Sequence, residues 1–114
     1  MNLQVWKSGI ELVKRVYLDT ESFPAEEQFG LTSQIRRAAV SIPANIAEGA
    51  ARGSKKEFRQ FLIIARGSLS ELDTLLLISK EVGLLVNKRF EGLHELVNSV
   101  SAMMSGLLKS LSTS

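Results

Sequence analysis

Apolar residues recur along this chain at alternating steps of three and four, which is the period of one face of an α-helix. Four segments carry such a stripe, and the alternating pattern that is typical of β-strands is absent. The stripes consist of Leu3, Trp6, Ile10, Val13 and Tyr17; Leu31, Ile35, Ala38, Ile42, Ile46 and Gly49; Phe58, Leu62, Ala65, Leu69, Leu72 and Leu76; and Phe90, Leu93, Val97, Val100, Met104, Leu107 and Leu111. Near-heptad stripes are typical of helices that pack at shallow angles, so the sequence predicts an all-α fold.

Helix-capping residues stand between the stripes. Ser54 and Glu57 fit the S-x-x-E capping box, so we expect the third helix to begin there, after a sharp corner at Gly53. Gly83 suits a left-handed C-terminal cap, and Asn87 can cap the last helix. Because the connections are short, consecutive helices should be antiparallel, and the sequence predicts an up-down-up-down four-helix bundle.

The length of the chain suits one domain. With 114 residues, of which 45% are hydrophobic, it is long enough for one core and too short for two ordinary domains. No repeat or linker interrupts it, so we expect a single bundle over residues 1–114, with a frayed tail at residues 110–114.

A proline, Pro43, stands within the second predicted helix. In a helix interior, proline costs about 3 kcal/mol relative to alanine, because it cannot donate a backbone hydrogen bond and its ring crowds the preceding turn. Either the helix breaks near Ser41 or it continues with a kink. We favour the kink, because the apolar stripe resumes in phase at Ile46 and Gly49.

The opposite face of this second helix is polar. It carries Arg37, Ser41, Asn45, Glu48 and Arg52, with alanines on its flanks. This face is either solvated or covered by another helix. Because small residues flank it in place of the usual lysines and glutamates, we expect it to pair with a neighbouring subunit or with the third helix of its own chain.

The third predicted helix has more apolar surface than one seam uses. Ile64, Leu75 and Ile78 fall outside its stripe. A monomeric bundle has no use for this surplus, so we expect the protein to be a homo-oligomer that associates through these residues.

Residue types that carry enzyme chemistry are scarce. The chain has no cysteine, and its single histidine, His94, has no second histidine with which to bind a metal. The stretch GAARGSKKE does not match the spacing of a phosphate-binding loop. We therefore expect no enzyme activity, no catalytic residues, no metal and no cofactor. The lack of cysteine, of a signal-peptide layout and of a long apolar run favours a cytoplasmic protein that crosses no membrane.

The net charge of +2 conceals a basic middle segment. Residues 31–66 carry seven cations against two carboxylates, a net charge of +5, whereas residues 1–30 and 67–114 have net charges of −2 and −1. The candidate nucleic-acid-binding residues are Arg36, Arg37, Arg52, Lys55, Lys56, Arg59 and Arg66. Such cations neutralise phosphates, which dominate sequence-independent affinity for nucleic acid.

The same cations have a second interpretation as ordinary surface charge, with ion pairs inside the bundle such as Arg66 with Asp73. Exposed aromatic residues are expected to be few, and Tyr17 falls in the apolar stripe of the first helix. Contacts with phosphates and with nucleic-acid shape are therefore favoured over stacking on single-stranded bases.

Residues 30–77 closely resemble the 23S rRNA intervening-sequence protein family, and a looser similarity covers most of the rest of the chain. The family blocks fall on Arg36–Arg37, on SIPANIAEG at 41–49 and on ARGS at 65–68. The resemblance implies an antiparallel four-helix bundle that assembles into a homopentamer. Similar accessory proteins of diversity-generating retroelements bind nucleic acid and partner a reverse transcriptase.

The function that these observations favour is a non-enzymatic oligomeric module that binds RNA or DNA through the basic segment. The alternative is a protein-interaction scaffold, or an accessory subunit, that makes no direct contact with nucleic acid.

Overall fold

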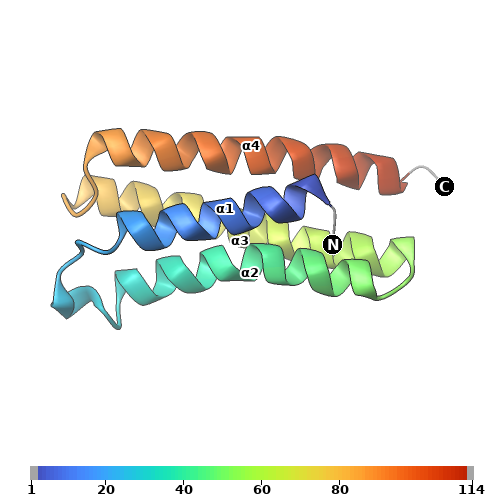
Figure 1. Cartoon of the computed structure of the whole chain (residues 1–114), viewed down its shortest axis with the longest axis horizontal. Coiled ribbons are helices and arrows are strands. Elements are labelled where there is room, and N and C mark those ends of the chain that lie inside the picture. The colour runs from blue at the N-terminus through green and yellow to red at the C-terminus, as the bar shows by residue number, and fades with distance from the viewer. Residues whose placement is uncertain (1–2, 113–114) are drawn as a thin grey trace.

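Four long helices and one short turn make up the part of the chain that the structure describes (Figure 1). The structure, a computed structural model, describes residues 3–112. Its elements are α1 (Gln4–Asp19), the 3₁₀ turn η1 (Ala25–Glu27), α2 (Leu31–Ala51), α3 (Lys55–Glu81) and α4 (Asn87–Ser112). Residues 110–112 of the tail that was predicted to be frayed are therefore helical, and residues 113–114 lie outside the described range.

The helices form a ring of antiparallel neighbours. Each helix packs against the one that precedes it, and α1 also packs against α4. Figure 1 shows the start of α1, the end of α4 and the α2–α3 turn at one end of the bundle, with the other two connections at the opposite end. The bundle measures 47 × 23 × 20 Å along its principal axes. The predicted all-α, up-down-up-down four-helix bundle is confirmed.

Two glycines turn the chain at the ends of helices. Gly53 and Gly83 both have a φ of 84°, a conformation that glycine adopts without a steric penalty. At the end of α3, the amide of Leu84 donates to the carbonyl of Ser79, and the amide of Gly83 donates to that of Lys80. These two bonds form a Schellman motif, as the position of Gly83 in the sequence predicts.

The starts of α3 and α4 differ in how they are capped. Ser54 Oγ accepts a hydrogen bond from the amide of Glu57 at 3.1 Å, which confirms the predicted cap of α3. Asn87 is the first residue of α4 and not the residue before it, so the prediction that Asn87 caps this helix was wrong. Its side-chain amide donates instead to the carboxylate of Glu91 at 3.1 Å.

The apolar stripes of α2 and α3, and that of α4 as far as Met104, line the core as predicted, whereas near the end of α4 Leu108 is buried and the predicted Leu107 is half-buried. The largest fully buried side chains are Leu12, Ile35, Ile42, Ile46, Leu62, Leu72, Leu76, Leu93, Met104, Val16, Val100 and Thr20. In α1 the predicted stripe was wrong by one position, because the buried residues are Val5, Gly9, Leu12, Val16 and Asp19. Trp6 and Val13 are only half-buried, and Tyr17 is 43% exposed. Gly9 is one of these buried residues but has no side chain, so the pattern of apolar residues did not reveal which face of α1 is buried.

Gly9 belongs to the seam because Pro43 of α2 packs against it. A Cβ atom at Gly9 would lie 3.4 Å from Cβ and 3.6 Å from Cδ of the proline. Pro43 is buried inside a continuous α2, so the helix does not break near Ser41, and Figure 1 shows it as one ribbon with a gentle bow. Burial of the ring against α1 offsets the helix-propensity cost of the proline.

A second glycine, Gly49, brings the C-terminal end of α2 onto α3. A Cβ atom at this position would lie 2.6 Å from Cβ of Phe61, 3.1 Å from Cδ1 of Phe58 and 3.3 Å from the carbonyl oxygen of Phe58. A side chain at Gly49 therefore requires the two helices to move apart. The glycine of the SIPANIAEG block thus has a structural role, because it allows α2 and α3 to pack closely.

Candidate nucleic-acid interface

The polar face of α2 is partly used inside the chain. Ser41 Oγ and Ser68 Oγ of α3 are hydrogen-bonded at 2.8 Å. The side-chain amide of Asn45 donates two hydrogen bonds to Ser41: one to its carbonyl oxygen at 2.8 Å and one to its Oγ at 2.9 Å. Of the alternatives for this face, pairing with the third helix of the same chain is therefore present at Ser41, whereas Asn45 bonds to Ser41 within α2 itself.

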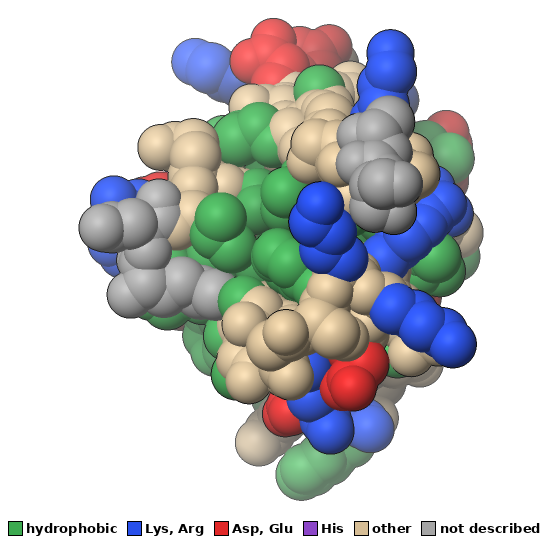
Figure 2. Space-filling model, turned by 90° about the vertical axis from the view of Figure 1, so that its right-hand side faces the viewer, with side chains coloured by type: hydrophobic (Ala, Val, Ile, Leu, Met, Phe, Trp, Pro, Cys, Tyr) green, Lys and Arg blue, Asp and Glu red, His purple; other side chains and the backbone are tan. Residues whose placement is uncertain are grey.

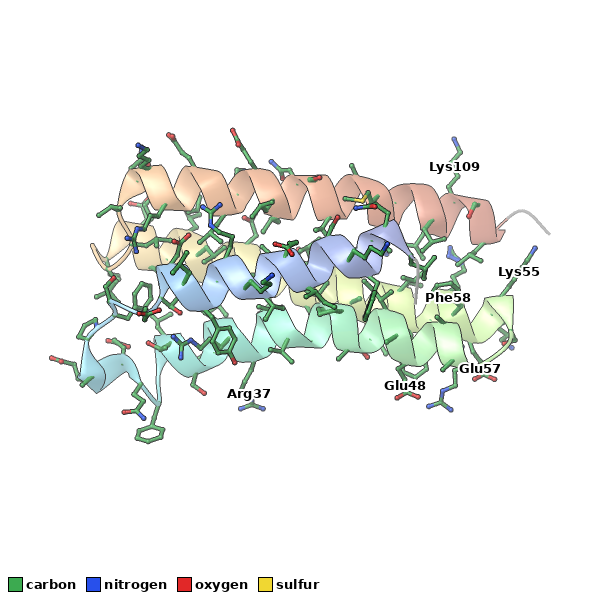
Figure 3. All side chains as sticks on the ribbon, viewed as in Figure 1. Arg37, Glu48, Lys55, Glu57, Phe58 and Lys109 are labelled. Atoms are coloured by element: carbon green, nitrogen blue, oxygen red, sulfur yellow. The ribbon has the colours of Figure 1, made fainter. Side chains whose placement is uncertain are left out.

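The end of the same face carries a small ionic cluster. Arg52 Nη2 lies 3.1 Å from the carboxylate of Glu48, and Arg52 Nε lies 3.9 Å from that of Glu57. The guanidinium also lies above the ring of Phe61, 5.0 Å from its centroid. Figure 3 shows Glu48 and Glu57 on the outside of the bundle, so Arg52 forms exposed ion pairs rather than a free cationic site.

Arg36 is likewise bound within the chain. Its Nε donates to Thr20 Oγ1 at 3.0 Å, and its Nη2 donates to the carbonyl of Tyr17 at 3.4 Å. The guanidinium lies 4.5 Å from the centroid of the Tyr17 ring. These contacts join α2 to the end of α1 and fix the position of one positive charge.

The other predicted cations differ from Arg36 and Arg52 in their surroundings. In residues 3–112, no carboxylate lies within ion-pairing distance of Arg37, Lys55, Lys56, Arg59 or Arg66. Arg59 is half-buried, and its Nη1 atom is enclosed without a hydrogen-bond partner. The pair of Arg66 with Asp73, which the alternative interpretation of these cations offered as an example, is absent.

His94 takes the place that was expected for Arg66. Its Nδ1 atom lies 2.8 Å from Oδ1 of Asp73, which joins α4 to α3, and its ring stacks on Phe90 with centroids 5.5 Å apart. Within the described part of the chain, no three histidine or acidic side chains gather in a way that could hold a metal ion. No helix among these residues is long and apolar enough to cross a membrane.

The unpaired cations do not form one patch. Figure 3 shows Arg37 pointing outward from α2, well away from Lys55 at the α2–α3 turn. Lys109 of α4 lies at the same end of the bundle as Lys55 (Figure 3). Sequence analysis missed Lys109, because it lies in a segment with a net negative charge and only the fold brings it to the basic residues. In Figure 2, which views this end, Lys and Arg side chains lie beside exposed hydrophobic side chains, mostly on the right of the view, with Asp and Glu side chains above and below.

We call the group of cations at this end the basic end; it consists of Arg52, Lys55, Lys56, Arg59 and Lys109. Arg52 is neutralised by Glu48 and Glu57, whereas the four others have no ion-pair partner in the range that the structure describes. Charge of one sign that the chain itself does not neutralise is what a polyanion binds.

The predicted apolar surplus of α3 is only partly exposed. Ile64 and Ile78 are 52% and 41% exposed, as expected for a contact surface. Leu75 is 8% exposed and belongs to the core, so its assignment to an outer face was wrong. Helix α3 packs against both α2 and α4, and a helix with two neighbours buries a strip wider than one seam.

A groove of about 580 Å³ runs beside the first half of α2. It is lined by Tyr17, Gln28, Phe29, Thr32, Ser33, Arg36, Arg37, Val40 and Ser41. The ring of Phe29 is 91% exposed. No pattern in the sequence indicated this groove, because Phe29 lies in a connecting segment and Tyr17 was expected in the core.

The chain matches the family model described as 23S rRNA-intervening sequence protein over residues 1–106. Among solved structures, it is similar to a crystal structure of a protein with unknown function from the S23 ribosomal protein family of Bacteroides thetaiotaomicron, with a TM-score of 0.82. That match covers 92% of this chain and 98% of the other at 21% sequence identity, so it establishes the fold alone. A comparison with curated proteins gives no match. Because the family model spans most of its length, the chain belongs to the 23S rRNA-intervening sequence protein family.

Proposed function

We propose that this protein is a non-enzymatic oligomeric module that binds RNA or other nucleic acid through its basic end. The observation that carries the proposal is the unneutralised charge of Lys55, Lys56, Arg59 and Lys109, which come from two helices and lie at one end of the bundle. Cations that have no partner within the protein bind phosphates and release the counterions of the nucleic acid.

Some of the predicted cations have partners within the chain and others do not, and this difference supports the basic end as the binding surface. Arg36 and Arg52 already have partners within the chain: Arg36 donates to Thr20, and Arg52 forms an exposed ion pair with Glu48. Lys55 and Lys56 are exposed at the start of α3, where they are free to reach a phosphate. The nucleic-acid-binding set that we propose is therefore smaller than the predicted one and gains Lys109.

The outer face of α3 supports the proposal of an oligomer. Ile63 and Leu77 are 42% and 44% exposed and lie on the same side of the helix as the exposed Ile78. Between them, this side presents the small or uncharged residues Gly67, Ser70 and Thr74. The exposed residues Arg66 and Glu71 border this stripe, and the uncharged stripe between them is long enough to contact another subunit.

We propose a homopentamer on the basis of the family resemblance. Repetition of the basic end around a closed oligomer would place several weak sites on one polyanion, and linked sites bind more tightly than each site alone. This avidity explains how a chain with a net charge of only +2 could retain RNA.

The test is binding of a structured RNA as a function of salt, with the double variant K55E/K56E compared with K14E/K88E. Both variants change the net charge equally, but Lys14 and Lys88 lie outside the basic end. We expect wild-type affinity to fall steeply with added salt, K55E/K56E to lose RNA while it keeps its oligomeric mass, and K14E/K88E to retain RNA. Equal binding by all three proteins, or no binding by the wild type, would refute the proposal.

A second candidate function is a protein-interaction scaffold or an accessory subunit, for example of a reverse transcriptase. The exposed apolar residues on the outer face of α3 favour this candidate, because a contact through them requires no nucleic acid. An oligomer that remains intact and binds no RNA at any salt concentration would support this candidate.

A further inference from the structure

We infer that the groove beside the first half of α2 receives an unpaired base of a bound nucleic-acid strand, with Phe29 as the stacking surface and Arg37 as the phosphate contact. This inference rests on the proposed function and adds to it a single-stranded ligand and a second contact region. The groove lies between the end of α1, the segment after η1 and α2. Its volume of about 580 Å³ falls within the usual range for ligand sites.

The aromatic residues of the groove are available to a ligand. Phe29 is 91% exposed, an unusual position for a phenylalanine, and Tyr17 and Val40 are each 43% exposed. Every base has a π face, so an exposed aromatic ring binds unpaired bases with little dependence on sequence. Exposed aromatic residues were expected to be few, and two of them, Phe29 and Tyr17, meet at this groove.

The charge of the groove selects an anion. Arg36 and Arg37 both line it, and no carboxylate does. Arg36 is fixed by Thr20 and by the ring of Tyr17, so it supplies a stationary positive charge. Arg37 points outward from α2 without an ion pair in the described chain, as Figure 3 shows, and its guanidinium has the geometry for a bidentate contact with phosphate.

The wall of the groove also has an unused polar atom. Thr32 lines the groove, is 9% exposed, and its hydroxyl oxygen is enclosed without a hydrogen-bond partner. Threonine in a helix adopts two side-chain rotamers, so rotation about χ1 offers a way to turn this hydroxyl toward a ligand. An aromatic surface, a fixed cation, a free cation and an unpaired hydroxyl together match the base and the phosphate of one nucleotide.

The experiment measures fluorescence anisotropy of a short fluorescein-labelled oligouridylate and of a duplex of equal length. The variants are F29A, F29W, R37Q and, as a matched loss of one exposed cation, K88Q. Analytical ultracentrifugation of each variant reports whether the groove instead contacts a second copy of the chain.

We expect F29A to weaken binding of the single strand by about tenfold, the effect of losing one stacked base, and to leave duplex binding unchanged. F29W should restore the single-strand affinity, and R37Q should weaken it more than K88Q does. Unchanged binding by F29A and R37Q, in a protein whose RNA affinity K55E/K56E still abolishes, would overturn this inference and leave the proposed function standing. Loss of oligomeric mass in F29A would assign the groove to a subunit contact, and a wild type that binds no nucleic acid would overturn both.

Discussion

Replacement of Gly49 by alanine should destabilise the bundle, although alanine is the better helix former. The added Cβ would lie 2.6 Å from Cβ of Phe61 and 3.3 Å from the backbone oxygen of Phe58. Neither atom is the far end of a flexible side chain, so a rotamer change cannot relieve the contact. Helices α2 and α3 would have to separate where Gly49 now holds them together.

Two opposing terms set the magnitude. Overpacking of a close contact costs about 1–3 kcal/mol, whereas alanine in place of a helical glycine gains about 0.5–1 kcal/mol. We therefore expect G49A to lower the free energy of unfolding by a net amount of about 1–2 kcal/mol. In a domain of this size, each kcal/mol corresponds to a change in Tm of about 4 °C.

The assay is urea and thermal unfolding followed by circular dichroism, with G106A as the matched control. A Cβ atom at Gly106, which lies inside α4, would meet nothing within 4 Å. G106A should therefore gain about 0.5–1 kcal/mol from helix propensity alone. All samples need the same protein concentration, because self-association makes Tm depend on it. A G49A protein as stable as G106A would refute the reasoning.

Four further substitutions test the assignments of the helix faces. Leu75→Ala should lower the free energy of unfolding by about 2–5 kcal/mol, because it removes a core side chain, and an effect below about 1 kcal/mol in urea unfolding would contradict its burial. Ile78→Ser should leave the urea midpoint nearly unchanged but reduce the mass found by ultracentrifugation if α3 contacts another subunit. Ser68→Ala should cost about 1 kcal/mol through its bond to Ser41. Glu48→Ala should cost less than about 0.5 kcal/mol, because its pair with Arg52 is exposed; a larger loss in thermal unfolding would reveal an unseen partner.

The sequence predicted the bundle well because most of its core residues are large and apolar. The stripes of α2, α3 and α4 needed no tertiary information, and the corner at Gly53 followed from a local capping pattern. The register of α1 could not be predicted in the same way. Its seam includes Gly9, which packs against Pro43 of another helix. Because glycine has no side chain, a pattern of apolar residues gives no sign that this position is buried.

The candidate sites were less predictable than the fold, because side-chain partners decide which residues are available. Seven cations looked equivalent in the sequence, but Arg36 is bound to Thr20 and Arg52 to Glu48. Lys109 joins the basic end only after the chain folds back, and Phe29 stands out only once its exposure is known. Sequence distance and local composition contain neither kind of information.

The contact between Gly9 and Pro43 has a consequence for how the helices find their alignment. Apolar stripes repeat, so two helices that carry them can slide by one turn and still bury similar surface. Such a slide would bring Val5 or Leu12 of α1 against the proline ring, where a Cβ atom would already touch Cβ of Pro43 at 3.4 Å and the further carbons of a larger side chain would crowd the ring. The close contact between Gly9 and Pro43 therefore disfavours the shifted alignments and favours one longitudinal position of α1 on α2.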